Sequence, residues 1–63
     1  STFKGSDRQI RGAVLRLLAD GKSRTKQMIT EQLLDFDSER VTTQIEKLFA
    51  EGLLQKSCQT YHL

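Results

Sequence analysis

The chain has 63 residues, of which 37% are hydrophobic, and its 10 basic residues exceed its 8 acidic residues by two. A domain this small buries only about 60% of its unfolded surface, so nearly every apolar residue is needed in one core. The single cysteine, Cys58, excludes an internal disulfide and a cysteine-ligated zinc or iron–sulfur site. No apolar run approaches the roughly 20 residues of a membrane span, so we expect no membrane partner and a cytoplasmic location.

The two parts of the chain differ in charge. Residues 1–27 hold seven basic and two acidic residues, a charge of +5, whereas residues 28–63 hold three basic and six acidic residues, a charge of −3. A polyanion such as a nucleic acid would therefore be attracted to the N-terminal part. The same asymmetry is compatible with a small domain that binds no polyanion.

The first predicted element is a helix over residues 7–20, preceded by a lead-in or linker at residues 1–5. Ser6 and Gln9 have the spacing of a capping box, which marks a helix start. A second helix is predicted over residues 25–33, with Thr25 as its N-cap. The folded domain is therefore expected to span residues 6–63.

A third helix is predicted over residues 38–51, where apolar residues recur at i, i+4, i+7 and i+8 from Val41. Gly52 can adopt the left-handed conformation that ends a helix. Leu53–Leu54 and Tyr61–Leu63 flank a polar turn and are predicted to be the strands of a hairpin. Tyr61 is expected at the edge of the core.

These elements predict a mainly α fold: a winged helix-turn-helix with a three-helix core and a small C-terminal β-hairpin wing. The predicted core consists of Ile10, Val14, Leu17, Leu18, Ile29, Leu33, Val41, Ile45, Leu48, Phe49 and Leu54.

Nucleic-acid binding is the first functional hypothesis from this layout, and two helices offer a contact face. The outward face of the third helix holds Glu39 and Glu46, which would repel phosphates, so a solvated face is favoured there. The start of the first helix is the better candidate. The side chains of Lys4, Arg8 and Arg11, with backbone N–H groups that begin at Ser6, would clamp a phosphate. The alternative is that Arg11 only forms an i,i+4 ion pair with Asp7.

The sequence holds no candidate catalytic residue and no cofactor motif. The only histidine, His62, has no acid or cysteine at a spacing that suggests a catalytic partner, and the four glycines form no phosphate loop. We therefore expect no enzymatic activity from this chain.

The run Phe3–Gly12 resembles the F-x-G-[ST]-D-R-Q-[VI]-R-G motif of actinobacterial A/G-specific adenine DNA glycosylases (MutY-like), where it opens a C-terminal winged-helix segment. The resemblance continues through residues 13–16 and returns at residues 48–54 and 61–63. Arg24 departs from the pattern, because an apolar residue is commoner there.

The resemblance implies a non-catalytic accessory domain in base-excision repair of A:8-oxoguanine mispairs. Its partners would be double-stranded DNA, bound weakly and without sequence preference, and its own upstream catalytic domain. The iron–sulfur cluster of such an enzyme would lie in the upstream part, so no cluster or catalytic role falls on this sequence. Two alternatives stay open: the DNA-binding domain of a transcription regulator, and a protein-interaction winged helix that uses the acidic face of its third helix.

Overall fold

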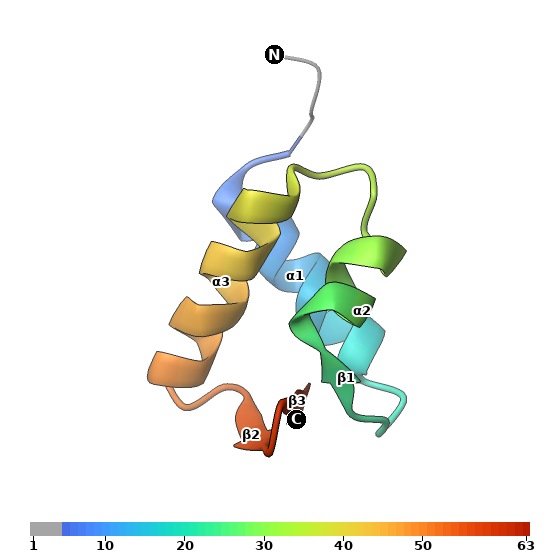
Figure 1. The fold of residues 1–63 in the computed structure, drawn as a ribbon. Helices are drawn as coiled ribbons and strands as arrows, with labels where there is room; N and C mark the ends of the chain where they lie inside the picture. Colours follow the sequence, from blue (N-terminus) through green and yellow to red (C-terminus); the bar gives the residue numbers. More distant parts are fainter. Residues whose placement is uncertain (1–4) are drawn as a thin grey trace.

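The computed structural model describes residues 5–63 as three helices and a three-stranded antiparallel sheet, with about half of the chain helical (Figure 1). Lys4, one of the predicted phosphate-binding residues, lies outside the described residues. None of the helices within residues 5–63 is long and apolar enough to cross a membrane. The elements in chain order are α1 (Asp7–Leu18), β1 (Arg24–Thr25), α2 (Lys26–Gln32), α3 (Ser38–Ala50), β2 (Gln55–Ser57) and β3 (Thr60–His62).

The starts of α1 and α2 confirm the predicted caps. The Ser6 hydroxyl accepts a hydrogen bond from the Gln9 backbone N–H at 3.3 Å, and the Gln9 side chain accepts one from the Ser6 N–H at 2.9 Å, which completes the capping box. The Thr25 hydroxyl accepts a hydrogen bond from the Met28 N–H at 3.1 Å. Both helices begin where a side chain satisfies backbone donors that would otherwise lack a partner.

The predicted helix ends lie one or two residues too far along the chain. Helix α1 stops at Leu18 rather than at residue 20, because the Ala19 N–H bonds to the Arg16 carbonyl and the chain tightens into a turn. Helix α3 stops at Ala50, and the N–H groups of Gly52 and Leu53 then bond back to the Phe49 and Leu48 carbonyls. This is the Schellman arrangement, and Gly52 adopts the required positive φ of 83°.

The hydrophobic core lies between the three helices and the inner face of the sheet. Leu17 and Leu33, both predicted in the core, are partly buried against it. The prediction for Phe49 is wrong: it is 45% exposed, because the i+8 position falls at the edge of the α3 stripe, and its ring packs edge-on against Tyr61. The fully enclosed apolar residues are Ile10, Val14, Leu18, Ile29, Val41, Ile45, Leu48, Leu54 and Tyr61.

The sheet differs from the predicted hairpin in three ways. Its first hairpin strand is Gln55–Ser57 rather than Leu53–Leu54, because the latter residues close the end of α3 and Leu54 enters the core. Its second hairpin strand is Thr60–His62 instead of Tyr61–Leu63, and a third strand, β1, was not predicted. Strand β3 lies in the middle of the order β1-β3-β2, with Arg24 opposite Tyr61 on one side and Lys56 opposite Tyr61 on the other.

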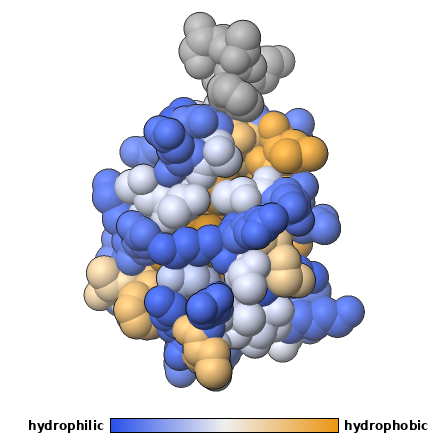
Figure 2. All heavy atoms as spheres, in the orientation of Figure 1, coloured by the Kyte–Doolittle hydropathy of each residue, from blue (hydrophilic) through white to orange (hydrophobic). Residues whose placement is uncertain are grey.

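The hairpin lies at the end of the molecule away from the turn that joins α2 to α3 (Figure 1). Cys58, in its two-residue turn, is exposed and has a positive φ of 58°. The face in Figure 2 is mostly hydrophilic, and its apolar atoms form small separate groups. This face therefore offers no broad apolar surface.

Replacing a core leucine tests the core assignment. Leu48→Ala should lower the free energy of unfolding by about 2–5 kcal/mol, because the side chain is fully buried and a cavity would replace it. That loss is comparable with the whole stability expected for a domain of this length, roughly 3–9 kcal/mol. The matched control is Leu34→Ala, since Leu34 is 76% exposed, and it should change stability by no more than about 0.5 kcal/mol. Equal losses in urea titrations of the two variants would contradict the assignment.

Candidate functional site

The predicted phosphate clamp at the start of α1 is largely engaged within the protein. The Ser6 hydroxyl and N–H are both used in the capping box. Arg11 donates two hydrogen bonds to the Glu51 carboxylate at the end of α3, one of them 2.8 Å long between Nη1 and Oε2. This contact raises the pKa of Arg11 and lowers that of Glu51. Arg8 is exposed and makes no ion pair with any residue from 5 to 63.

The alternative Asp7–Arg11 ion pair is replaced by one between different elements. Asp7 accepts a hydrogen bond from Arg40 of α3 at 2.9 Å, which lowers the pKa of Asp7. The Asp7–Arg40 and Arg11–Glu51 pairs both join α1 to α3. Within residues 5–63, Arg8 is therefore the one predicted clamp residue whose charge is not matched by a carboxylate.

A further ion pair fixes the chain between α1 and β1. Arg24 donates to Asp20 through both terminal nitrogens, at 2.7 and 3.1 Å, and to the Leu17 carbonyl at 3.1 Å. Asp20 also accepts a hydrogen bond from the Lys22 N–H at 2.9 Å. The Arg24 hydrogen bond, together with that from Lys22, lowers the pKa of Asp20 from 3.8 to about 2. The charge of +5 on residues 1–27 already counts Asp20, and it is further offset by carboxylates from the rest of the chain, such as Glu51 at Arg11.

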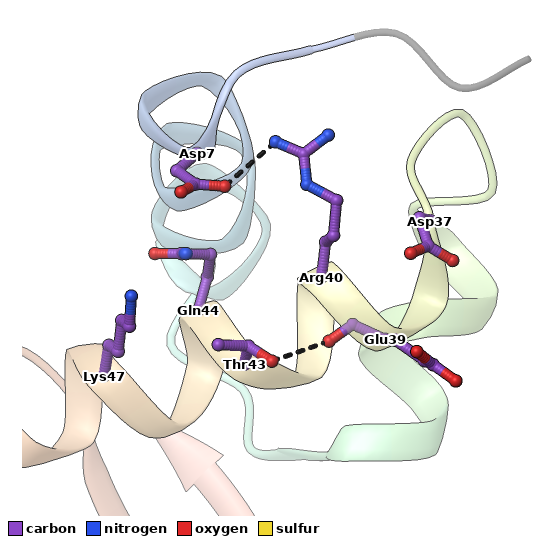
Figure 3. Close-up of a pocket in the computed structure, with 7 residues that line it drawn as sticks. All are labelled: Asp7, Asp37, Glu39, Arg40, Thr43, Gln44 and Lys47. Atoms are coloured by element: carbon purple, nitrogen blue, oxygen red, sulfur yellow. Dashed lines mark hydrogen bonds and ion pairs between the residues drawn. The ribbon is translucent and has the colours of Figure 1, made fainter. Parts of the chain in front are cut away.

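A hollow of about 300 Å³, which we call the helix hollow, lies between the start of α1 and the exposed side of α3 (Figure 3). Within residues 5–63, three acidic and two basic residues line it, so this described lining carries a charge of −1. In Figure 3 the Arg40 guanidinium reaches across to Asp7 instead of pointing into open space. The lining residues are Asp7, Asp37, Glu39, Arg40, Thr43, Gln44 and Lys47.

A second hollow, of about 350 Å³, lies between the start of α2 and the β2–β3 hairpin, and we call it the hairpin hollow. The two hollows are similar in size, so charge distinguishes them. Two lysines and no carboxylate line the hairpin hollow, which gives its lining a charge of +2. The lining residues are Thr25, Lys26, Gln27, Lys56, Gln59 and Tyr61.

Tyr61 is the floor of the hairpin hollow, and both lysines lie against its ring. Lys26 Nζ is 5.9 Å and Lys56 Nζ 5.5 Å from the ring centroid, within the range of cation–π contacts. Glu46 of α3 accepts a hydrogen bond from Lys26 at 2.5 Å. That contact raises the pKa of Lys26 and lowers the pKa of Glu46, which the charge of Lys56 lowers further. With Glu46 included, the net charge around this hollow is +1.

Sequence reasoning missed the hairpin hollow. A correct hairpin register would have paired Lys56 with Tyr61, because they are cross-strand neighbours. No local signal places Lys26 there, since its position depends on the pairing of β1 with β3, more than 30 residues apart in the chain. The only histidine, His62, lies in β3 and is partly exposed, and its Nδ1 lies 2.9 Å from the Leu63 carbonyl oxygen.

No cluster of histidine, cysteine, aspartate or glutamate side chains within residues 5–63 has an arrangement that would hold a metal ion. Comparisons with protein-family models, with curated proteins and with solved structures found no match to this chain.

The Asp20–Arg24 contact predicts an acid-dependent loss of stability. Because the pKa of Asp20 in the folded state is about 2, below its ordinary 3.8, its ionised form stabilises the fold above about pH 4. This contribution to stability is lost as the pH falls from about 4 to about 2. Asp20→Asn should therefore be less stable than the unmodified chain at pH 7, and the difference in melting temperature should shrink towards pH 2.

The control is Asp35→Asn, because Asp35 is exposed and makes no ion pair within the described part of the chain. This variant should follow the unmodified chain at neutral and at acidic pH. A melting-temperature difference for Asp20→Asn that stays constant from pH 7 to pH 2 would contradict the role of this ion pair.

Proposed function

We propose that this chain is a non-catalytic winged-helix domain that binds double-stranded DNA weakly and without sequence preference, as an accessory part of an A/G-specific adenine DNA glycosylase. The observation that carries the DNA-binding proposal is the order of elements. A first helix and a short strand precede the α2–α3 pair, and a hairpin that returns to that strand follows it. This order is consistent with a winged helix-turn-helix, and in helix-turn-helix domains the second helix of the pair lies in the major groove of the duplex.

Non-specific binding is favoured over base reading because of the charges on α3. Its outward side carries Glu39 and Glu46, of which Glu46 is paired with Lys26, and the helix hollow beside it has a described lining charge of −1. Carboxylates can accept hydrogen bonds in the major groove only from the amino groups of cytosine and adenine, and they repel the phosphates on either side. A transcription regulator that reads an operator would need fewer carboxylates on the outward side of α3.

The link to a glycosylase rests on the sequence resemblance at residues 3–12, 48–54 and 61–63. Most of the first of these segments folds as the capped start of α1, and the second contains the Gly52 stop of α3. These features are structural, so they support a shared fold and leave the catalytic chemistry to another part of the enzyme. On this proposal the domain's task is to add phosphate contacts to those of the catalytic domain.

The proposal is tested by titrating the 63-residue chain into two duplexes of unrelated sequence at low salt. Equal dissociation constants and a shallow salt dependence, about −0.9 in logarithmic slope for each neutralised phosphate, are expected. Thr43→Ala, on the outward side of α3, should leave both constants unchanged, because that side is not expected to read bases. A duplex with an A:8-oxoguanine pair should release no adenine.

Two results would contradict the proposal. A preference for one duplex that Thr43→Ala abolishes would favour the transcription-regulator alternative. Absence of binding to either duplex would favour the protein-interaction alternative, in which the acidic side of α3 contacts a partner.

A further inference from the structure

The hairpin hollow has the chemistry of an anion site. We propose that it holds one phosphodiester group of a DNA strand between the side chains of Lys26 and Lys56. The inference rests on the proposed DNA binding and assigns its principal contact to the hairpin side of the domain instead of the predicted flank of α1.

Both lysines are held on one rigid support. Tyr61 is only 3% exposed and belongs to the core, so its ring cannot move aside without disturbing the packing. Lys56 is its cross-strand neighbour, and Lys26 directly follows Thr25, which pairs with Thr60 on the other edge of β3. The sheet therefore fixes the relative positions of the two lysine backbones before any ligand arrives.

The other groups in the lining suit a phosphate oxygen. Gln59 carries an amide donor, and the Gln27 amide donates to Glu31 at 3.3 Å through one of its N–H groups. A phosphodiester offers only acceptors, so the lysine ammonium groups and these amide N–H groups are the donors that can bond to it. The helix hollow is less suited to a phosphate, since three of its seven described lining residues are carboxylates.

The charge favours a phosphodiester over other anions. A phosphodiester carries a single negative charge, which matches the net +1 of Lys26, Lys56 and Glu46, whereas a phosphorylated side chain carries about −1.5 to −2 at pH 7. A lysine ammonium binds phosphate as a point charge, whereas bidentate recognition of a carboxylate or a phosphate uses the flat fork of an arginine. Arg24 of β1, the strand beside Tyr61, is bound to Asp20.

Glu46 weakens this site from within the protein. Its carboxylate already holds Lys26, so a phosphate must share or displace that contact. Removing the carboxylate leaves both lysines available to the phosphate. Glu46→Gln should therefore tighten DNA binding, an effect opposite in sign to the loss of either lysine.

The test is a fluorescence titration of a labelled duplex at about 50 mM salt with the full 63-residue chain and its variants. One phosphate contact contributes a factor of about 15 to the binding constant at that salt relative to 1 M salt, from the slope of about −0.9. Lys56→Gln should weaken binding by up to that factor and make the salt slope shallower. Lys26→Gln should weaken it less because Glu46 already competes for that lysine, and Glu46→Gln should steepen the slope.

The matched control is Lys47→Gln, which removes the same charge from the lining of the helix hollow and should change binding far less than Lys56→Gln. Thermal melts check that each variant remains folded, as expected for exposed or half-exposed side chains.

Three results would overturn the inference. If Lys26→Gln and Lys56→Gln bind like the unmodified chain while Arg8→Gln loses affinity, the contact lies on the flank of α1 and only the proposed function survives. If Lys47→Gln weakens binding as much as Lys56→Gln, the effect is one of overall charge. If the unmodified chain binds no duplex, the inference and the proposed function fail together.

Discussion

The packing of α1 against α3 is the constraint on which the rest of this structure depends. Each helix presents one fully buried apolar stripe, and the two stripes meet in the centre of the core. Two ion pairs, Asp7–Arg40 and Arg11–Glu51, join the helices outside that contact. These pairs are exposed, so they add little stability, but they engage the guanidinium groups of Arg11 and Arg40, which would otherwise be available to a ligand. The two stripes are Ile10, Val14 and Leu18 on α1, and Val41, Ile45 and Leu48 on α3.

Tyr61 connects this core to the surface where we place the phosphate contact. Its ring lies in the core cluster and meets Phe49 edge-on, with the ring centroids 6.1 Å apart. The same ring lies beneath Lys26 and Lys56. A residue that holds the sheet on the helices thus also contacts both lysine ammonium groups, of which that of Lys26 is bound to Glu46. The order of elements, the charge of the hairpin hollow and the resemblance to glycosylase segments all support one account of weak, sequence-independent DNA binding.

The local features of the fold could be predicted from the sequence, whereas the surface charges could not. The Ser6–Gln9 capping box and the Gly52 stop depend on residues only a few positions apart, so the sequence pattern alone identifies them. The partner of Arg11 could not be predicted in this way, because Glu51 is 40 positions away and the sequence also offers the i,i+4 neighbour Asp7. The short strand β1 carries no periodicity of its own. The hairpin hollow could not be predicted because it depends on the pairing of β1 with the distant β3, so the predicted binding surface was placed on the flank of α1.

The central claim is that the hairpin side of the domain faces the DNA, and an amide chemical-shift map tests it most directly. The ¹⁵N-labelled 63-residue chain would be titrated with a short duplex at low salt, and the shift of each backbone amide recorded. The account predicts the largest shifts on the hairpin and at the start of α2, at Gln27, Lys56 and Gln59, with Glu39 and Thr43 little changed. Shifts concentrated on the outward side of α3, or on Arg8 alone, would contradict it.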